Sequence, residues 1–435
     1  MTGDDARVRQ AMQPLEEAMR RHARYRGKMQ MAPKVPVAGL DDFAVWYTPG
    51  VAAPCLAIRD RPEAAYDLTN KGNTIAIVSD GTRVLGLGDI GPLAGLPVME
   101  GKALLFKVLG GVDAVPLCLD CRDPDALVRT VRALAPSFGA INLEDIAQPK
   151  CFRVLDALRG SLDIPVWHDD QQGTATVLLA GLTTALAAVG KELAAARIAM
   201  VGMGAANVAA YRLLTACGAD PGRIVACDSV GTLHPGRSDI AARRDAYAAK
   251  WRVCTESNRD GVKGGIDAAL AGADVCIAFA KSGPGVIDPA WVRAMAPDAI
   301  VFACANPNPE IWPWEAAAAG ARIVGTGRSD FPNQINNALA FPGIFRGVLD
   351  VRARTITDGM AIAAARAIAA RAAERGEILP PLDDAEVAIR VAVATGIQAQ
   401  REGVARVSLS DAEVAARATA AIAEARRLCA LAAPG

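Results

Sequence analysis

Histidine is scarce in this chain. Only three histidines stand among its 435 residues, namely His22, His168 and His234. The scarcity of histidine therefore argues against a zinc site built on several histidines and against a hydrolase that needs a histidine base. An excess of charge is missing as well, because basic and acidic residues number 47 each. With no net positive charge, the composition does not favour nucleic acid or an anionic membrane surface as a partner.

Long apolar runs are also missing. The longest, residues 176–190, is short for a bilayer and is interrupted by a glycine and two threonines, so it fits a buried helix better. The amino-terminal segment carries acidic residues and no apolar core, which argues against a secretory signal. We therefore expect a cytoplasmic protein whose ten cysteines are reduced thiols. Cys118 and Cys121 form one CxxC, which would suit half a zinc site or a redox pair, but strand-end cysteines packed in the core are favoured.

Short apolar runs alternate with helical patterns in two series. Strands are expected first at residues 74–78, 113–119, 140–143 and 164–167, and then at residues 196–201, 223–227, 275–279, 300–303 and 322–324. This alternation predicts an α/β fold with parallel sheets covered by helices. The expected units are an N-terminal catalytic domain with a parallel sheet (residues 1–162), a Rossmann-like dinucleotide-binding domain (residues 163–345) and C-terminal helices that pack back on both (residues 346–435).

The second series opens with a dinucleotide-binding fingerprint. Its first strand runs into a turn and then a helix, and the turn consists of Gly202, Met203, Gly204, Ala205, Ala206 and Asn207. The two glycines permit a tight turn and close approach of a pyrophosphate to the helix N-terminus, although Asn207 replaces the usual third glycine. Asp228 ends the next strand, where an acid would bind the adenosine ribose. A plain glycine turn is the alternative, but the strand–turn–helix–strand–Asp order favours an NAD or NADP site.

Two acidic pairs follow strands of the first series. Glu144 and Asp145 end one apolar strand, and Asp169 and Asp170 end the next. Carboxylates at the carboxyl ends of parallel strands point into the crevice where such folds bind ligands. Four such charges raise one another's pKa steeply unless they are compensated, and a hard cation such as Mg²⁺ or Mn²⁺ prefers carboxylate oxygens. Capping of the following helices is the alternative, but two pairs on consecutive strands favour a metal site.

Other polar residues stand in apolar or glycine-rich surroundings. Tyr47 precedes a Thr-Pro-Gly turn, Arg83 precedes a glycine-rich segment, and Lys102 begins a mostly apolar helical run in which burial would lower its pKa towards that of a usable base. Asn306 and Asn337 follow later strands of the second series. Taken singly, each of these residues could be a cap, a turn residue or a snorkelling side chain.

Together these segments resemble the malic enzyme family, in its short bacterial and archaeal form. The resemblance runs from about residue 25 to residue 351 and rests on long, ordered motifs: YTPGVAAPC, SDGTRVLGLGDIGPLAGLPVMEGKALLFK, INLEDIAQPKCF, HDDQQGTATVLLAGL and FPNQINNALAFPGIFRGVLDVRA. It implies an enzyme that oxidises malate with a nicotinamide cofactor and a divalent metal ion, releasing carbon dioxide and pyruvate. It also implies at least a homodimer.

The resemblance implies roles for the residues that match the family's motifs. Lys102 matches the general base, Tyr47 the general acid, and Asp169 a carboxylate beside the catalytic lysine. Arg83 matches the arginine that grips a malate carboxylate. The remaining matches are the metal ligands Glu144, Asp145 and Asp170, and the substrate and nicotinamide contacts Asn306 and Asn337.

One departure from the family bears on the cofactor. Many relatives carry a lysine two residues after the acid that matches Asp228, and Val230 stands there in this chain. Without that lysine a 2′-phosphate loses a partner, which favours NAD as the cofactor. Arg237 and Arg243 are the alternative partners for a 2′-phosphate. Two alternative functions stay open: a malolactic or substituted-malate enzyme on the same fold, and a non-catalytic dinucleotide sensor, which would need neither Lys102 nor the acidic ligands.

Overall fold

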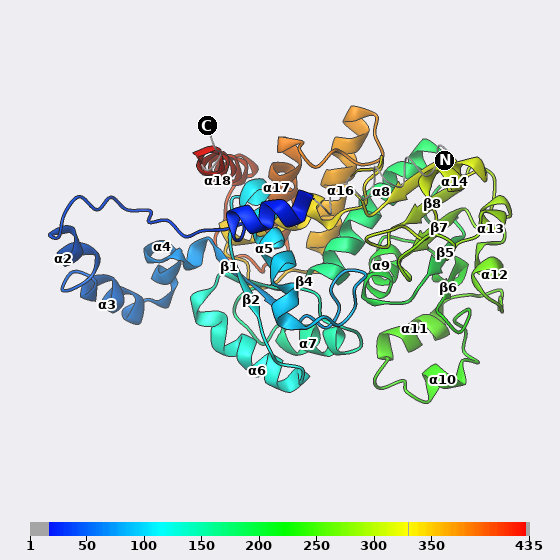
Figure 1. Ribbon diagram of the computed structural model, residues 1–435, viewed down its shortest axis with the longest axis horizontal. Coiled ribbons are helices and arrows are strands. Elements are labelled where there is room, and N and C mark those ends of the chain that lie inside the picture. The colour runs from blue at the N-terminus through cyan, green and yellow to red at the C-terminus, as the bar shows by residue number, and fades with distance from the viewer. Residues whose placement is uncertain (1–16, 329, 432–435) are drawn as a thin grey trace.

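The computed structural model describes residues 17–328 and 330–431 of the chain. Two parallel sheets, one from each half of the chain, lie side by side (Figure 1). The first sheet has the order β2-β1-β3-β4, with strands β1 (Thr74–Ser79), β2 (Asp113–Cys118), β3 (Ala140–Leu143) and β4 (Val166–His168). All four strands were expected from the sequence. β4 pairs with β3, so the first sheet continues past residue 162, where the sequence had suggested the end of the N-terminal domain.

Helices cover both faces of the first sheet because successive side chains of a strand point to opposite faces. Ala76 and Val78 of β1 belong to one core, which they share with helices α6 (Pro124–Leu134) and α7 (Lys150–Leu158). Ile75 and Ile77 of the same strand belong to the other core, with helix α5 (Gly91–Gly110). An uninterrupted apolar strand is what a sheet buried on both faces requires.

The second sheet has the order β6-β5-β7-β8-β9, with every strand parallel. Its strands are β5 (Ile198–Val201), β6 (Ile224–Cys227), β7 (Val275–Ala278), β8 (Ile300–Ala303) and β9 (Ile323–Thr326). Its helices are α8 (Thr174–Ala188), α9 (Ala205–Ala216), α10 (Ser238–Ala241), α11 (Ala248–Glu256), α12 (Ile266–Leu270), α13 (Pro289–Arg293) and α14 (Pro313–Ala318). The α/β fold with a Rossmann-like half is therefore confirmed.

Four helices at the end of the chain pack back on the two halves, as expected. They are α15 (Phe341–Asp350), α16 (Asp358–Arg375), α17 (Ala385–Arg401) and α18 (Asp411–Leu431). Helix α16 packs on α8, while α15 and α18 pack on α5. Phe106 of α5 meets Phe341 and Phe345 of α15 with ring centroids 4.5 and 5.0 Å apart. Within the described residues no helix is both long and apolar enough to cross a membrane.

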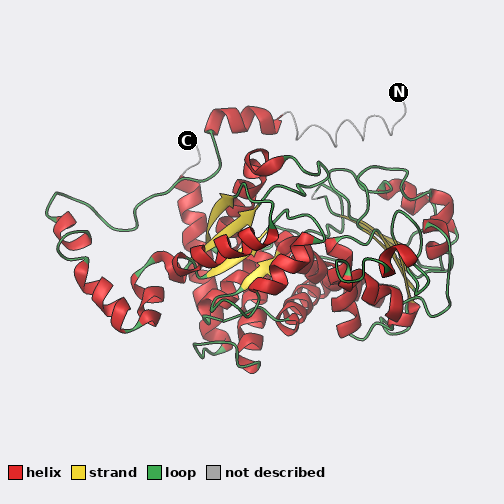
Figure 2. Cartoon of the chain, turned by 90° about the horizontal axis from the view of Figure 1, so that it is seen from below, coloured by secondary structure: helices red, strands yellow, loops and turns green. Residues whose placement is uncertain are grey.

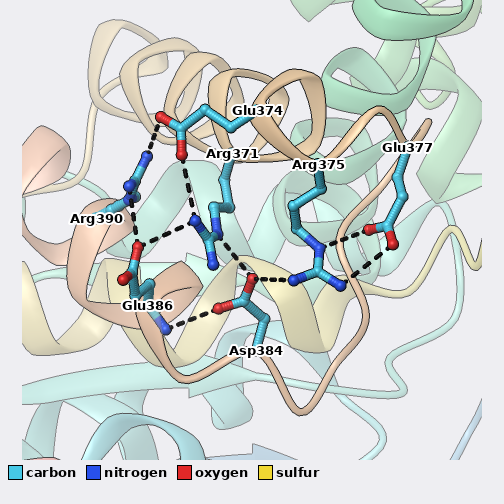
Figure 3. A network of polar contacts seen from close by, with 7 residues as sticks. All are labelled: Arg371, Glu374, Arg375, Glu377, Asp384, Glu386 and Arg390. Atoms are coloured by element: carbon cyan, nitrogen blue, oxygen red, sulfur yellow. Dashed lines mark hydrogen bonds and ion pairs between the residues drawn. The ribbon is translucent and has the colours of Figure 1, made fainter.

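An ion-pair network closes the turn between α16 and α17 (Figure 3). The side chain of Asp384 is almost fully buried, and its carboxylate accepts a hydrogen bond from Arg371 Nε at 2.7 Å. Arg375 reaches the same carboxylate at 3.6 Å. Further members of the network are Glu374, Glu377, Glu386 and Arg390. The two arginines compensate the charge of the buried Asp384 carboxylate. We therefore assign this network a structural role in stabilising the turn.

An N-terminal arm projects from the body of the molecule (Figures 1 and 2). We define the arm as residues 37–60, which include helices α2 (Asp42–Trp46) and α3 (Ala52–Asp60). Neither helix has a single buried residue. Helix α4 (Ala65–Leu68) follows the arm and leads the chain back to β1.

Candidate active site

A cavity of about 1170 Å³ opens between the carboxyl ends of the two sheets. Thirteen of the residues singled out from the sequence line it: Arg83, Lys102, Glu144, Asp145, Asp170, Gly202, Met203, Gly204, Ala205, Ala206, Asp228, Asn306 and Asn337. They come from both halves of the chain, and the loops after β1, β3, β4, β5, β6 and β8 contribute to the lining. This is the place where open parallel sheets bind their ligands.

Lys102 lies on α5 with its side chain buried between two carboxylates. Its Nζ donates to Asp169 Oδ2 at 2.6 Å and lies 2.9 Å from Glu144 Oε1, and it stands 4.4 Å from the centre of the Phe341 ring. Burial by itself lowers the pKa of Lys102, but Asp169 and Glu144 outweigh it and hold the pKa above its ordinary value. The prediction that burial lowers the pKa of Lys102 was wrong. The residues around Lys102 in its own helix are mostly apolar, but Asp169 and Glu144, which are distant in the sequence, lie against its side chain.

Asp169 lies behind Lys102 and does not line the cavity. It is fully buried, and its other oxygen accepts a hydrogen bond from Trp167 Nε1 at 3.1 Å. Residues Asp169–Gly173 form one π-helical turn before α8. A Cβ on Gly173 would stand 1.8 Å from Asp169 Oδ1, so only glycine leaves room for this carboxylate. Asp169 is therefore a positioning residue for the lysine.

Three further carboxylates face the cavity. The Asp145 backbone N–H donates to Asp170 Oδ2 at 2.8 Å, and Asp145 adopts a positive φ of 54°. Burial and the neighbouring Asp170 raise the pKa of Asp145 to about 8. Burial, only partly offset by Lys102, also raises the pKa of Glu144 well above its ordinary value. Carboxylates with raised pKa values are under-compensated, and a bound cation would relieve them.

The donor types of these residues fit a hard divalent cation. Asp145 Oδ2 is buried and has no hydrogen-bond partner in the described part of the chain. These side chains are not yet arranged around a cation, however. Among the described residues, no group of three His, Cys, Asp or Glu side chains lies close enough together to hold a metal ion. Glu144 is turned towards Lys102, at 2.9 Å. Glu144, Asp145 and Asp170 could hold a cation once the Glu144 side chain turns away from the lysine.

The glycine turn after β5 has the shape that the sequence predicts. Gly202 has a φ of 83°, and a Cβ on it would stand 2.6 Å from the carbonyl oxygen of Phe279. Asn207 departs from expectation, because it is fully buried and does not line the cavity. Its Nδ2 donates to the carbonyl oxygens of Val201 and Gly202 at 3.1 and 2.6 Å. Asn207 therefore supports the turn through two backbone carbonyls, a contact that a third glycine could not make.

Asp228 directly follows β6, lines the cavity and lies between two cationic side chains. Arg237 donates to both of its carboxylate oxygens at 3.0 Å, and Lys250 Nζ lies 2.5 Å from Oδ2. Burial alone would raise the pKa of Asp228, but the hydrogen bonds from Arg237 and Lys250 outweigh it and hold the pKa below its ordinary value. Lys250 also lines the cavity. The sequence offered no sign of Lys250, because it lies 22 residues further on, in α11.

Glu310 is a second residue that sequence reasoning missed. It is fully buried, and its carboxylate accepts the backbone N–H groups of Ala280 at 2.7 Å and Ala305 at 3.0 Å. Both alanines line the cavity, and Asn306 follows directly. Glu310 thereby ties together the loops that follow β7 and β8. The only local sign was an acid placed just before the apolar pair Ile311 and Trp312.

Tyr47 lies away from the cavity that the other candidates share. It follows α2 on the arm, and 69% of its surface is exposed. No tyrosine is among the described residues that line the cavity. The expected base and the expected acid are therefore separated within one copy of the chain.

Known proteins match both halves of this chain. The family description "Malic enzyme, N-terminal domain" fits residues 26–159, and "Malic enzyme, NAD binding domain" fits residues 171–400. The NAD-dependent malic enzyme of Geobacillus stearothermophilus is 49% identical over 85% of this chain and 76% of its own length. The bifunctional malic/malolactic enzyme of Bacillus subtilis is 47% identical over 87% of this chain and 91% of its own length.

A solved structure extends the likeness to the whole fold. The crystal structure of Entamoeba histolytica malic enzyme superposes with a TM-score of 0.96 at 47% identity, covering 99% of this chain and 90% of that chain. At 99% coverage the superposed part includes the arm. Both halves of the fold, and the cavity between them, thus correspond to one family of proteins. The chain belongs to the malic enzyme family.

Proposed function

We propose that this chain is a malic enzyme, which oxidises (S)-malate with NAD or NADP in the presence of Mg²⁺ or Mn²⁺ and releases pyruvate and carbon dioxide. One observation carries the proposal. Lys102, with Glu144 beside it and Asp169 behind it, lines the same cavity as the nucleotide-binding turn, which is encoded about 100 residues further on. A dinucleotide sensor would need the turn but would gain nothing from a buried lysine among acids.

Each polar residue has a task in this reaction. Arg83 binds a malate carboxylate and orients the C2 hydroxyl towards Lys102. Lys102 Nζ takes the proton of that hydroxyl as the C2 hydride leaves. Burial favours the neutral amine, and only the neighbouring carboxylates hold a proton on it, so neutralising those carboxylates frees the base. Tyr47 returns a proton to C3 after carbon dioxide has left, and Asn306 and Asn337 contact the substrate and the nicotinamide side.

Two bound groups complete the chemistry. When bound, the nicotinamide would accept the hydride, and the cation would supply Lewis-acid stabilisation of the negative charge that develops on the substrate oxygens. Glu144, Asp145 and Asp170 would hold the cation. The backbone of the turn at Gly202, Gly204, Ala205 and Ala206 would face the pyrophosphate at the N-terminus of α9.

We infer that NAD is preferred and that NADP is also accepted. Asp228 stands at the ribose end of the cavity, where a carboxylate binds ribose hydroxyls and repels a 2′-phosphate. Lys250 lies against Asp228 and would give a 2′-phosphate one cationic partner. The lysine that many relatives carry at the position of Val230 is thus replaced in part by a lysine from α11.

A spectrophotometric assay tests the proposal. Malate, Mn²⁺ and either NAD or NADP should give steady formation of reduced cofactor, with pyruvate as the product. Thorough chelation should abolish turnover, and added Mg²⁺ or Mn²⁺ should restore it. Activity that survives chelation would refute the metal assignment, and a lack of turnover with both cofactors would refute the enzyme.

Malolactic activity is the second candidate, and one relative favours it. The Bacillus subtilis protein, 47% identical to this chain, is named a bifunctional malic/malolactic enzyme. The residues assigned here recognise the 2-hydroxy acid core that both reactions share. Lactate in place of pyruvate, without net formation of reduced cofactor, would identify the malolactic reaction.

We place the protein in the cytoplasm on the state of its cysteines. All ten are free thiols in the structure, and five of them are buried. Reduced thiols are typical of a cytosolic setting. Fractionation with a cytosolic marker tests this placement.

A further inference from the structure

A second cavity, of about 250 Å³, lies at the opposite end of the first sheet. Asn73 lines it and directly precedes β1, whereas Arg83 of the active-site cavity follows β1. The six residues of β1 separate the two cavities by roughly 20 Å of extended strand. The two cavities share no lining residue among the described residues. We call the second cavity the basal pocket, and the residues that matter here are Lys34, Asn73, Arg346, Asp350, Arg352 and Arg417.

Each acid that lines the basal pocket is already paired with an arginine. Arg346 donates to both oxygens of Asp350, from Nε at 3.1 Å and from Nη2 at 2.7 Å, and both residues are buried. Arg352 pairs with Asp67. No other acid lines the pocket within the described part of the chain. The two acids therefore do not supply a free negative charge that would repel an anion.

Arg417 of α18 lines the same pocket without an acidic partner. Its Nη1 donates to a backbone oxygen, the carbonyl of Asp350, at 3.3 Å, and it makes no ion pair with any described residue. Glu413 lies one turn earlier in α18, but its carboxylate accepts hydrogen bonds from the backbone N–H and the hydroxyl of Ser410. The Arg417 guanidinium thus keeps most of its donors for a ligand.

Lys34 supplies a further cation from the segment before the arm. Its Nζ donates to Asn70 Oδ1 at 3.0 Å and lies 3.8 Å from the carboxylate of Asp113. That carboxylate is already paired with Lys107 at 2.7 Å. Lys34 and Arg417 therefore leave the basal pocket with an excess of positive charge.

The floor of the pocket comes from a motif that the active site uses only in part. The motif FPNQINNALAFPGIFRGVLDVRA supplies Asn337 to the active-site cavity and places the Phe341 ring 4.4 Å from Lys102 Nζ. Its second half supplies Arg346 and Asp350 to the basal pocket instead. A buried ion pair is weak evidence for stability, because well-packed apolar side chains of similar volume often serve as well. The need for a fold alone does not explain the charges at this end of α15.

We propose that the basal pocket binds a phosphate group, either as inorganic phosphate or as the end of a phosphate monoester. Phosphate is a compact anion whose oxygens accept several hydrogen bonds, and cations reach this pocket from three separate segments, at Lys34, Arg346 and Arg417. The volume suits a small anion better than a dinucleotide, since pockets for larger ligands measure about 300–1,000 Å³. A dicarboxylate fits less well, because its two charges are spread apart and the pocket also holds Asp67 and Asp350.

Calorimetric titration of the full chain with inorganic phosphate tests the site. Sodium chloride keeps the ionic strength constant, and saturating NAD occupies the glycine turn of the other cavity, where phosphate could also bind. The wild-type protein should bind one phosphate per chain. Lys34→Ala and Arg417→Ala each remove one exposed cation, so each should weaken phosphate binding about tenfold, which corresponds to about 1.4 kcal/mol.

Arg427→Ala is the matched control. Arg427 is an exposed arginine of the same helix, but it pairs with Glu424 and does not line the basal pocket. This variant should bind phosphate like the wild type. Equal affinity in the wild type, Lys34→Ala and Arg417→Ala would place the phosphate elsewhere and overturn the proposal. Absence of binding at millimolar phosphate, or tighter binding of succinate than of phosphate, would overturn it as well.

A second titration, with glycerol phosphate, identifies the source of the phosphate group. If this monoester binds as tightly as inorganic phosphate and is weakened by the same two substitutions, the pocket recognises the phosphate end of a larger molecule. If inorganic phosphate binds and glycerol phosphate does not, the free ion is the ligand. Both results support a phosphate site, and neither depends on turnover of malate, so this inference can fail or succeed independently of the proposed function.

Discussion

Substitutions of Lys102 and Tyr47 should impair different steps of the reaction. Lys102→Ala removes the base and should slow hydride transfer about 10²–10⁴-fold, followed as the formation of reduced cofactor in a single turnover. Tyr47→Phe keeps the ring and deletes only the hydroxyl, so it should lose exchange of the C3 protons of pyruvate with deuterated water, followed by NMR. Tyr25→Phe, at another exposed tyrosine, is the control. Wild-type exchange in Tyr47→Phe would pass the acid role to another group.

The single residue Glu310 should make the thermal stability of the protein depend on pH. Burial raises its pKa in the folded protein, so the folded state binds more protons than the unfolded chain does. Stability from this group is therefore highest below the ordinary glutamate pKa and falls as pH rises through the raised value. Glu310→Gln removes that fall but loses one backbone hydrogen bond at every pH. The Tm of the variant relative to wild type should therefore rise as the pH increases above the ordinary glutamate pKa, and parallel Tm curves would contradict it.

At the scale of elements, the π-helical turn before α8 should tolerate no side chain at Gly173. Gly173→Ala would place Cβ 1.8 Å from Asp169 Oδ1, so the carboxylate must shift, which disturbs the contact of its other oxygen, Oδ2, with Lys102. We expect a loss of about 1–3 kcal/mol of stability from overpacking, together with a loss of activity. Gly95→Ala in α5 meets nothing closer than 3.5 Å and is the control. Unfolding in urea and kcat measure the two effects, and an unchanged kcat in Gly173→Ala would show that the Asp169–Lys102 contact is dispensable.

The contact between β6 and α11 should set part of the cofactor preference. Lys250→Ala removes the cation beside Asp228, so kcat/KM for NADP should fall relative to NAD by about tenfold, which corresponds to about 1.4 kcal/mol. NAD should be affected little, because Arg237 still compensates Asp228. Arg252→Ala, in the same helix but paired with Glu256, is the matched control. An unchanged ratio would mean that other residues read the 2′ position.

For the whole molecule, the arm should decide the oligomeric state. Phe43→Asp places a charge on the exposed apolar face of the arm and should shift the protein from dimer towards monomer in sedimentation. Val230→Asp, at an exposed apolar position outside the arm, should leave the sedimentation unchanged. A Phe43→Asp protein that sediments like wild type would argue against a dimer contact made by the arm.

Local sequence was enough for the strands, because burial on both faces demands apolar β-branched runs wherever a strand occurs. It was also enough for the glycine turn, where Gly202 needs a positive φ and a close approach to the carbonyl of Phe279. The motifs likewise named the acids at the ends of β3 and β4. In each case the physical requirement acts within a few neighbouring residues, so the sequence by itself determines it.

Only the tertiary structure decided the rest, since those features depend on residues brought together from far apart. The pKa of Lys102 follows from Asp169 and Glu144, which other strands supply. The charge beside Asp228 comes from α11, and the support of the cavity loops comes from Glu310. The distance of Tyr47 from the cavity follows from the way the arm leaves the body, which no motif around Tyr47 records.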